Sequence, residues 1–287
     1  MMDGGPCVQF ATARTLYERT GRCDSVPSPQ MTRSLKTSNE VSGQRRVLTL
    51  AAAVKYIDAC GFCMLFANRS AALPSLYHAV TQRTLQREDW VWDKYSSMVW
   101  RWKDELPRRR LAYYGKYLRG RGTLISLAQL PNFLAMHQPV AGSGDHAGFY
   151  RAGRIREDAR IVWEALEEHG AMATLELRNA CRMDTKAGNK RFKRAILDLQ
   201  SLLIVAHFGA EQETKSWASG RYELTYRVFS KQNEAAKKLS VTQAQKNIAA
   251  KLLEWRPDAA PVQIARLFGW LKSEADSACQ AARQPAS

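Results

Sequence analysis

The chain between residues 155 and 228 shows a distinctive order of helical and strand patterns. Three stretches place apolar side chains three or four positions apart, as helices do, and they cover residues 155–169, 174–183 and 188–203. Thr174 is the expected cap of the second helix. Two β-prone runs follow at 203–208 and 222–228, separated by a polar stretch that predicts a hairpin with a long tip. Three helices followed by such a hairpin are typical of a winged helix-turn-helix.

Related patterns occupy residues 45–136. Apolar spacing from Arg46 onward predicts a helix that ends at Gly61, since glycine commonly stops helices. The elements predicted after it are a strand at 62–66, a helix at 74–80, a helix from Trp92 to Leu106 that Pro107 ends, and a strand at 123–126. This segment is therefore expected to form a domain resembling a winged helix.

Composition and pattern predict five segments, and the expected fold class is α+β, predominantly helical, with tandem winged helix-turn-helix domains. Residues 1–44 are rich in Ser, Thr, Pro and Gly, which favours a disordered basic tail in which Met31 is an alternative start to Met1. The other predicted segments are an N-terminal winged-helix-like domain (45–136), a linker (137–154), a winged helix domain (155–232) and a C-terminal helical segment forming a partial helix-turn-helix (233–287).

The chain carries a large excess of positive charge. Its 287 residues include 43 Lys and Arg against 27 Asp and Glu, a formal net charge of +16. Such a balance indicates a polyanionic partner, either nucleic acid or an anionic membrane face. A membrane-spanning protein is not expected, because no apolar run approaches the roughly 20 residues that a spanning helix needs. Six cysteines are too few for a disulfide scaffold, which favours a cytoplasmic location.

The third helix of the 155–232 segment is the expected recognition helix. Its leading turns carry Lys190, Arg191, Lys193 and Arg194, which suit contacts to bases and phosphates in a major groove. Lys215 and Arg221, in the predicted hairpin, are further candidate DNA-binding residues. The alternative is a solvated helix face that contacts proteins. The agreement of charge and helix order favours double-stranded DNA.

A second cationic cluster follows the helix that Pro107 is expected to end. Its candidate DNA-binding residues are Arg108, Arg109, Arg110, Lys116, Arg119 and Arg121. Tyr113, Tyr114 and Tyr117 lie among them and offer rings for stacking on bases, or are ordinary core or surface aromatics. For the neighbouring tryptophans, the ordinary structural role is favoured.

Other motifs offer little chemistry. Cys60 and Cys63 form a CxxC pair, but the pair follows a predicted helix instead of opening one, so buried apolar cysteines are expected. His78 stands alone, and the histidines at 137, 146, 169 and 207 are scattered without a triad. No phosphate-binding glycine loop, nucleophile elbow or HExxH motif occurs. We therefore expect no metal site and no small-molecule cofactor.

Taken together, the residues resemble the AlkZ/YcaQ-like winged-helix family, most closely its AlkZ-related branch. The resemblance covers about residues 45–270, and the stretches that carry it are 61–66, 73–77, 100–107, 112–122 and 155–229. It implies tandem winged helices that bind DNA, and the family's characterised members are DNA glycosylases that excise alkylated or crosslinked bases.

The resemblance also implies where catalytic residues would lie. Members use a Gln-apolar-Gln or Gln-apolar-Asp motif to position water, and Met64 and Phe66 stand at its two polar positions here. Asp104 and Glu105 match an acidic segment of the crosslink-repair members, and a carboxylate suits stabilisation of a cationic sugar and activation of water. The alternative is that they neutralise nearby cations. The expected function is DNA binding with the usual motif replaced; the alternatives are an active glycosylase using Asp104 or Glu105, and a transcriptional regulator.

Overall fold

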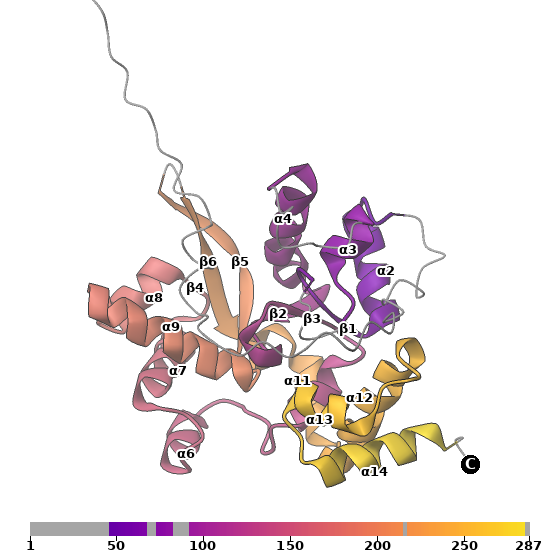
Figure 1. Cartoon of the computed structure of the whole chain (residues 1–287). Coiled ribbons are helices and arrows are strands. Elements are labelled where there is room, and N and C mark those ends of the chain that lie inside the picture. Colours follow the sequence, from indigo (N-terminus) through magenta and orange to yellow (C-terminus); the bar gives the residue numbers. More distant parts are fainter. Residues whose placement is uncertain (1–45, 68–72, 83–91, 215–216, 285–287) are drawn as a thin grey trace, which may run out of the picture. The chain divides into compact units, whose positions relative to one another are not determined.

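The computed structural model describes residues 46–67, 73–82, 92–214 and 217–284. All of them lie in the second of the two units into which the chain divides, residues 37–287. The predicted disordered tail, residues 1–44, and the candidate DNA-binding residue Lys215 lie outside the described residues. Within the described residues the fold is α+β and predominantly helical, with two small antiparallel sheets, as expected (Figure 1).

The first sheet follows the predicted helix at the start of the described chain. Helix α2 (Leu50–Cys60) is capped by Thr49, whose hydroxyl accepts from the amide of Ala52, and ends at Gly61 with φ 77°. The sheet has the order β1-β3-β2, made of β1 (Phe62–Met64), β2 (Ala112–Gly115) and β3 (Thr123–Ser126). Helix α3 (Leu76–Thr81) and helix α4 (Lys94–Arg108) lie between β1 and β2 in the chain.

Helix α4 differs from the sequence prediction at its end. Pro107 lies inside the helix instead of ending it, and the last helical residue is Arg108. Proline lacks the amide hydrogen that would donate to the carbonyl four residues earlier, so it weakens the last turn of α4, which ends one residue later. Asp93 caps the other end, where its side chain accepts from the amides of Tyr95 and Ser96. Trp102 is buried at 6% exposure, as the helical stripe predicts.

The second sheet is built in the same way as the first. Helix α7 (Glu157–His169) precedes β4 (Met172–Ala173), then α8 (Thr174–Ala180) and α9 (Lys186–Ser201), then β5 (Val205–Thr214) and β6 (Trp217–Leu224). The sheet order is β4-β6-β5, so helix, strand, two helices and two strands repeat with the same strand pairing as in α2 to β3. The three predicted helices are confirmed.

Three details of this second repeat correct the prediction. Ala173, not Thr174, occupies the N-cap of α8, and the Thr174 hydroxyl donates instead to the carbonyl of Gly220 (2.7 Å). The hairpin tip is short, because β5 continues to Thr214 and β6 begins at Trp217. The second strand also ends at Leu224, and helix α10 (Thr225–Val228) follows where a strand was predicted.

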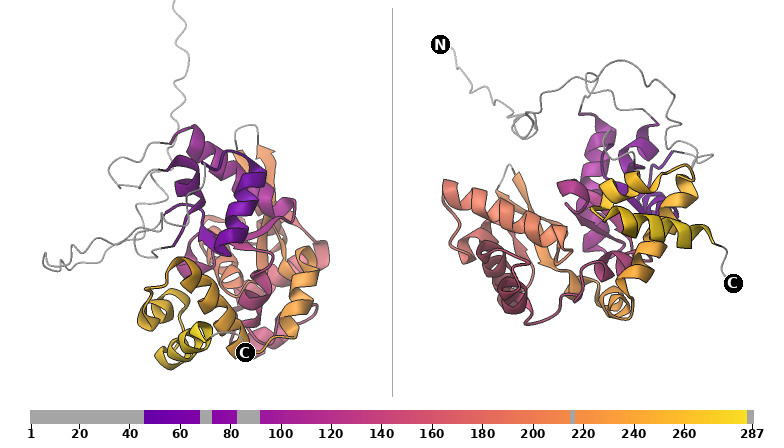
Figure 2. Two further views of the ribbon diagram at one scale, coloured as in Figure 1. Left: turned by 90° about the vertical axis from the view of Figure 1, so that its right-hand side faces the viewer. Right: turned by 60° about the horizontal axis from the view of Figure 1, so that its bottom comes forward.

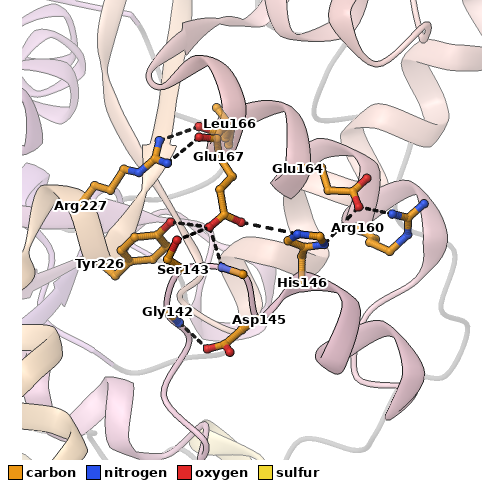
Figure 3. A network of polar contacts seen from close by, with 11 residues as sticks. Gly142, Ser143, Asp145, His146, Arg160, Glu164, Leu166, Glu167, Tyr226 and Arg227 are labelled. Carbon is orange, nitrogen blue, oxygen red and sulfur yellow. Dashed lines mark hydrogen bonds and ion pairs between the residues drawn. The ribbon is translucent and has the colours of Figure 1, made fainter.

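The segment 137–154, predicted to be a linker, contains helix α6 (His146–Arg151) and is tied to its neighbours by polar contacts (Figure 3). The Ser143 hydroxyl and the Gly144 amide each donate to the Glu167 carboxylate at 2.7 Å. Tyr226 donates to the same carboxylate at 3.0 Å, and His146 lies 3.1 Å from a Glu164 oxygen. The segment is therefore anchored to the end of α7 and to α10.

Helices form the rest of the described chain. Helix α5 (Leu130–Ala135) follows β3. The C-terminal part, where a helical segment was predicted over 233–287, contains α11 (Ser230–Lys237), α12 (Val241–Trp255) and α13 (Pro261–Phe268). Helix α14 (Lys272–Arg283) follows them within the same segment. None of the helices in the described ranges is long and apolar enough to cross a bilayer.

The C-terminal helices pack against the first repeat. Phe62 of β1 meets the rings of Phe133, Trp255 and Phe268 edge-on, with centroids 5.1 to 5.8 Å away. The Trp255 indole also donates to the carbonyl of Cys60 at 3.2 Å. Figure 2 shows these yellow helices beside the indigo α2, which α12 contacts. Because one apolar cluster spans these elements, α12 to α14 depend on the first sheet for their burial.

Candidate nucleic-acid interface

The exposed side of α9 carries the predicted recognition cations. Thr185 caps the helix by accepting from the amide of Gly188 at 3.0 Å. Phe192, Ile196 and Leu199 face the core, as the helical spacing predicts. The opposite positions are exposed to solvent, and they carry Lys190, Arg191, Lys193 and Arg194.

These four cations are not equivalent. The Arg191 guanidinium donates to both carboxylate oxygens of Asp158 on α7, at 3.1 and 3.0 Å from Nε. The hydrogen bonds and charge of Asp158 raise the pKa of Arg191. No carboxylate within the described ranges forms an ion pair with Lys190, Lys193 or Arg194. These three are therefore the cations of α9 best able to meet an external anion.

The loop after β2 lies against α9. The Lys116 amide donates to the side-chain oxygen of Gln200 on α9 at 3.1 Å. The short 3₁₀ helix η3 (Leu118–Gly120) also contacts α9. Desolvation and the charge of Lys193 lower the pKa of the Lys116 ammonium group, so these two cations lie close enough to interact. We call Lys116, Lys190, Lys193 and Arg194 the cationic surface.

Several other predicted DNA-binding residues have partners within the protein. Arg119 donates to the carbonyl of Arg266 through Nε and Nη2, at 3.1 and 2.6 Å, which ties η3 to α13. Arg109 pairs with Glu105 at 3.0 Å. Arg221 donates to the carbonyl of Ala171 at 2.8 Å and lies 3.4 Å from Glu211. Arg119 and Arg221 therefore link neighbouring segments through backbone carbonyls, whereas Arg109 forms only an exposed ion pair.

The three remaining arginines of this cluster are exposed on their own segments. Arg108 ends α4, and its aliphatic chain lies beside the backbone of Gly209 on β5. Arg110, with φ 54°, lies in the turn before β2, and Arg121 lies between η3 and β3. The cations after Pro107 thus divide between α4, the turn that follows it and the loop beside α9.

The tyrosines among these cations face the protein interior. Tyr113 is fully buried, and its hydroxyl donates to the carbonyl of Val205 at 3.1 Å. The Tyr117 hydroxyl lies 3.2 Å from His137 Nε2, and Tyr114 meets His207 edge-on with centroids 5.5 Å apart. Burial raises the pKa of all three phenols. The positions of these rings therefore do not favour stacking on bases. Tyr113 is a core aromatic residue, which was the alternative expectation.

Asp104, one of the two candidate catalytic carboxylates, belongs to a polar cluster between α4 and β5. Its carboxylate hydrogen-bonds to His207 Nε2 and lies 2.5 Å from the ammonium group of Lys103. The His207 ring is enclosed by Tyr114 and by Tyr222, whose ring centroid is 5.8 Å away. The sequence analysis missed His207, because nothing in the pattern links two residues 103 positions apart.

Burial and neighbouring charges shift the pKa values of the titratable groups in this cluster. Partial burial acts to raise the pKa of Asp104, but the hydrogen bond from His207 and the charge of Lys103 lower it overall. Burial lowers the pKa of His207 and that of Lys103. Asp104 is therefore ionised at neutral pH while His207 is neutral, so His207 donates Nε2–H to the carboxylate.

Glu105 has a different environment from Asp104. It points away from the cluster toward Arg109, one turn later on α4, and its side chain is 37% exposed. An exposed pair of this kind contributes little to stability. The two candidate carboxylates are thus distinguished by structure, and only Asp104 is held by groups from two elements.

The positions expected for the family's water-binding motif are apolar and mostly buried. Met64 is 2% exposed and lies in the core. Phe66 is half-buried against Tyr77 and Trp100, with ring centroids 5.6 and 6.4 Å away. Cys60 and Cys63 are buried and unbridged, as predicted. Within the described ranges, no group of three or more His, Cys, Asp or Glu side chains is arranged to hold a metal ion.

Comparison with known proteins identifies the family. No match was found among the curated proteins or the solved structures. The family model described as "AlkZ related" matches residues 47–269, which include both sheets, α9 and the cluster at Asp104. The chain belongs to the AlkZ-related family.

Proposed function

We propose that this protein binds double-stranded DNA along the cationic surface, as part of a DNA glycosylase-like role in repair. The observation that carries the proposal is the proximity of Lys116 to Lys193. It places the cation of the loop after β2 beside the leading half of α9. Adjacent unpaired cations lower the free energy of binding to phosphates by releasing condensed counterions. The net charge of +16 supports the same partner.

The repeated element order supports an interpretation as tandem winged helices. Each repeat has a helix, a strand, two helices and a hairpin, with the first strand paired to the last. In the second repeat α9 is then the recognition helix, whose leading turns enter a major groove. In the first repeat the equivalent helix is α4. Helices α12, α13 and α14 correspond to a partial third unit without a hairpin. The proposed domains remain 45–136, 155–232 and 233–287.

Active base excision is the second candidate function, and one observation favours Asp104 over Glu105 for it. Asp104 is ionised and held in place by Lys103 and His207, whereas Glu105 is engaged with Arg109. A fixed carboxylate can stabilise the positive charge that develops on a sugar as the bond to its base breaks. The apolar side chains of Met64 and Phe66 cannot orient water, so Asp104 would supply that function instead.

Salt-dependent binding tests the main proposal. Fluorescence anisotropy with a labelled duplex would be measured over a series of salt concentrations for the wild type, Lys116→Ala, Lys193→Ala and the double variant. Each substitution should weaken binding and reduce the slope of log affinity against log salt by about 1. Lys272→Ala on α14, outside the cationic surface, is the matched control and should leave the slope unchanged. Affinity that is indifferent to salt would refute the proposal.

A further inference from the structure

Helix α4 and the residue before its N-cap present exposed aromatic rings, whereas α9, at the equivalent place in its repeat, presents cations. Trp92 and Trp100 are 47% and 46% exposed. Their rings meet edge-to-face with centroids 5.8 Å apart, and the Trp92 indole donates to the Ser97 hydroxyl at 2.9 Å. Two large apolar rings held together at a surface mark a contact site more often than isolated apolar residues do.

The surroundings of Trp100 are polar on one side. The Lys103 ammonium group lies 4.4 Å from the centroid of the Trp100 ring and 2.5 Å from the carboxylate of Asp104. The cation therefore covers part of the ring, while nearly half of the Trp100 surface faces solvent. The Asp104 side chain is 22% exposed. A flat ligand resting on Trp100 would lie beside the ion pair of Lys103 and Asp104, in which the Lys103 side chain is 10% exposed.

We infer that Trp100, supported by Trp92, is a stacking site for an unpaired nucleobase of a bound DNA strand, beside Lys103 and Asp104. The inference rests on the proposed DNA binding. It adds a site for the base that leaves the duplex. Every base has an aromatic face, so stacking on tryptophan accepts any base sequence. Enzymes that act on a base take it out of the stack, and an aromatic surface is a common way to hold it.

Charge along α4 favours a nucleic acid strand over an apolar protein partner. Arg101 follows Trp100 directly, and Arg108 lies two turns further along; both are exposed. The phosphates that flank a stacked base can pair with these two arginines, whereas an apolar partner would leave both arginines without a counterpart. If this surface contacted a protein instead of DNA, Trp100→Ala would leave the binding of both DNAs unchanged.

The test compares two DNAs that differ by one base. Anisotropy would be measured for an intact duplex and for the same duplex with one bulged nucleotide, using the wild type, Trp100→Ala, Trp100→Phe and the control Leu271→Ala. Leu271 is 68% exposed and lies at the start of α14, so its loss removes a large exposed apolar side chain elsewhere. We expect the wild type and the control to prefer the bulged duplex by about tenfold. Trp100→Ala should abolish the preference, and Trp100→Phe should retain part of it.

A second measurement locates the base. With 5-iodouracil as the bulged nucleotide, irradiation should crosslink the base to a peptide that contains Trp100 or Trp92. Crosslinking elsewhere, or an unchanged preference in Trp100→Ala, would overturn the inference while salt-dependent duplex binding leaves the proposed function intact. Equal loss of binding to both DNAs in Trp100→Ala would also overturn it, because stacking on an unpaired base would not explain that loss. Absence of salt-dependent binding in the wild type would instead remove the proposed function.

Discussion

The carboxylate of Asp104 on α4 accepts a hydrogen bond from the buried imidazole of His207 on β5. This contact joins the first repeat to the hairpin of the second, and the hydrogen bond from Tyr113 to the Val205 carbonyl lies along the same strand. Burial keeps His207 neutral, so the pair is a carboxylate held by a neutral donor and not an ion pair. The relative placement of α4 and the hairpin therefore depends on a small polar cluster.

Removal of His207 should destabilise the protein substantially. His207→Ala removes the hydrogen bond to Asp104 and leaves a cavity between Tyr114 and Tyr222. We expect the free energy of unfolding to fall by about 3 kcal/mol, measured by urea denaturation at pH 8. His169→Ala is the control, since that side chain is 47% exposed at the end of α7, and its effect should stay within about 0.5 kcal/mol. Equal effects of the two substitutions would contradict the structural role given to His207.

Stability should fall as the pH drops below about 6.5, and His137 is one cause. Burial and the charge of Arg154 lower the pKa of His137 to about 4, while its ordinary pKa is near 6.5. Between these values the unfolded chain binds a proton at His137 and the folded chain does not. Each pH unit in this window should therefore cost up to about 1.4 kcal/mol of unfolding free energy from this residue.

The measurement for His137 is urea denaturation at intervals from pH 7.5 to 4.5. His137→Gln removes the titrating group and can retain a hydrogen bond with Tyr117, so its stability should depend less steeply on pH than that of the wild type. His207 contributes in the same direction, because its pKa is also lowered, and it should preserve part of the slope in the variant. Parallel curves of unfolding free energy against pH for the wild type and the variant would show that the pKa of His137 is the same in the folded and unfolded chains.

The sequence predicted helices well where apolar spacing and a stop signal agreed. Helix α2 ends at Gly61 and α7 ends at Gly170, both with positive φ, as the glycines indicate. The prediction failed where local preference was overridden. Tyr226 and Val228 alternate with polar residues as in a strand, yet Tyr226 in α10 donates to Glu167, a contact that no local pattern encodes.

A side chain at position 188 should disturb the first turn of α9. A Cβ at this position would lie 2.7 Å from backbone atoms of Met183, closer than real contacts allow. Gly188→Ala should therefore cost about 2 kcal/mol of unfolding free energy and should weaken duplex binding, since the first turn of α9 must move. Gly148→Ala on α6 is the matched control, because no atom lies within 4 Å of its added Cβ. That control should leave stability unchanged or raise it by up to about 1 kcal/mol.

The candidate site was only partly predictable, because some of its contacts join residues that are distant in the sequence. Exposure of Lys190 and Lys193 follows from the period of their own helix, and the structure agrees. The proximity of Lys116 to Lys193 depends on the packing of the β2–β3 loop against α9. The contact between Asp104 and His207 likewise depends on the two repeats meeting, so His207 looked isolated in the sequence.

Substitution of the two carboxylates should separate the enzyme alternative from simple DNA binding. Asp104→Asn removes the charge but keeps an oxygen that can accept from His207, so the cluster should survive. If Asp104 assists base excision, single-turnover release of an alkylated base from a duplex should fall by about 100-fold or more, because the variant can neither stabilise a cationic sugar nor accept a proton from water. Glu105→Gln should change the rate less than twofold, since Glu105 is engaged with Arg109 outside the cluster. Duplex affinity measured in parallel should be unchanged in both variants, which separates chemistry from binding. Absence of base release by the wild type from alkylated and crosslinked duplexes would contradict the enzyme alternative, and the cationic surface would then serve DNA binding alone.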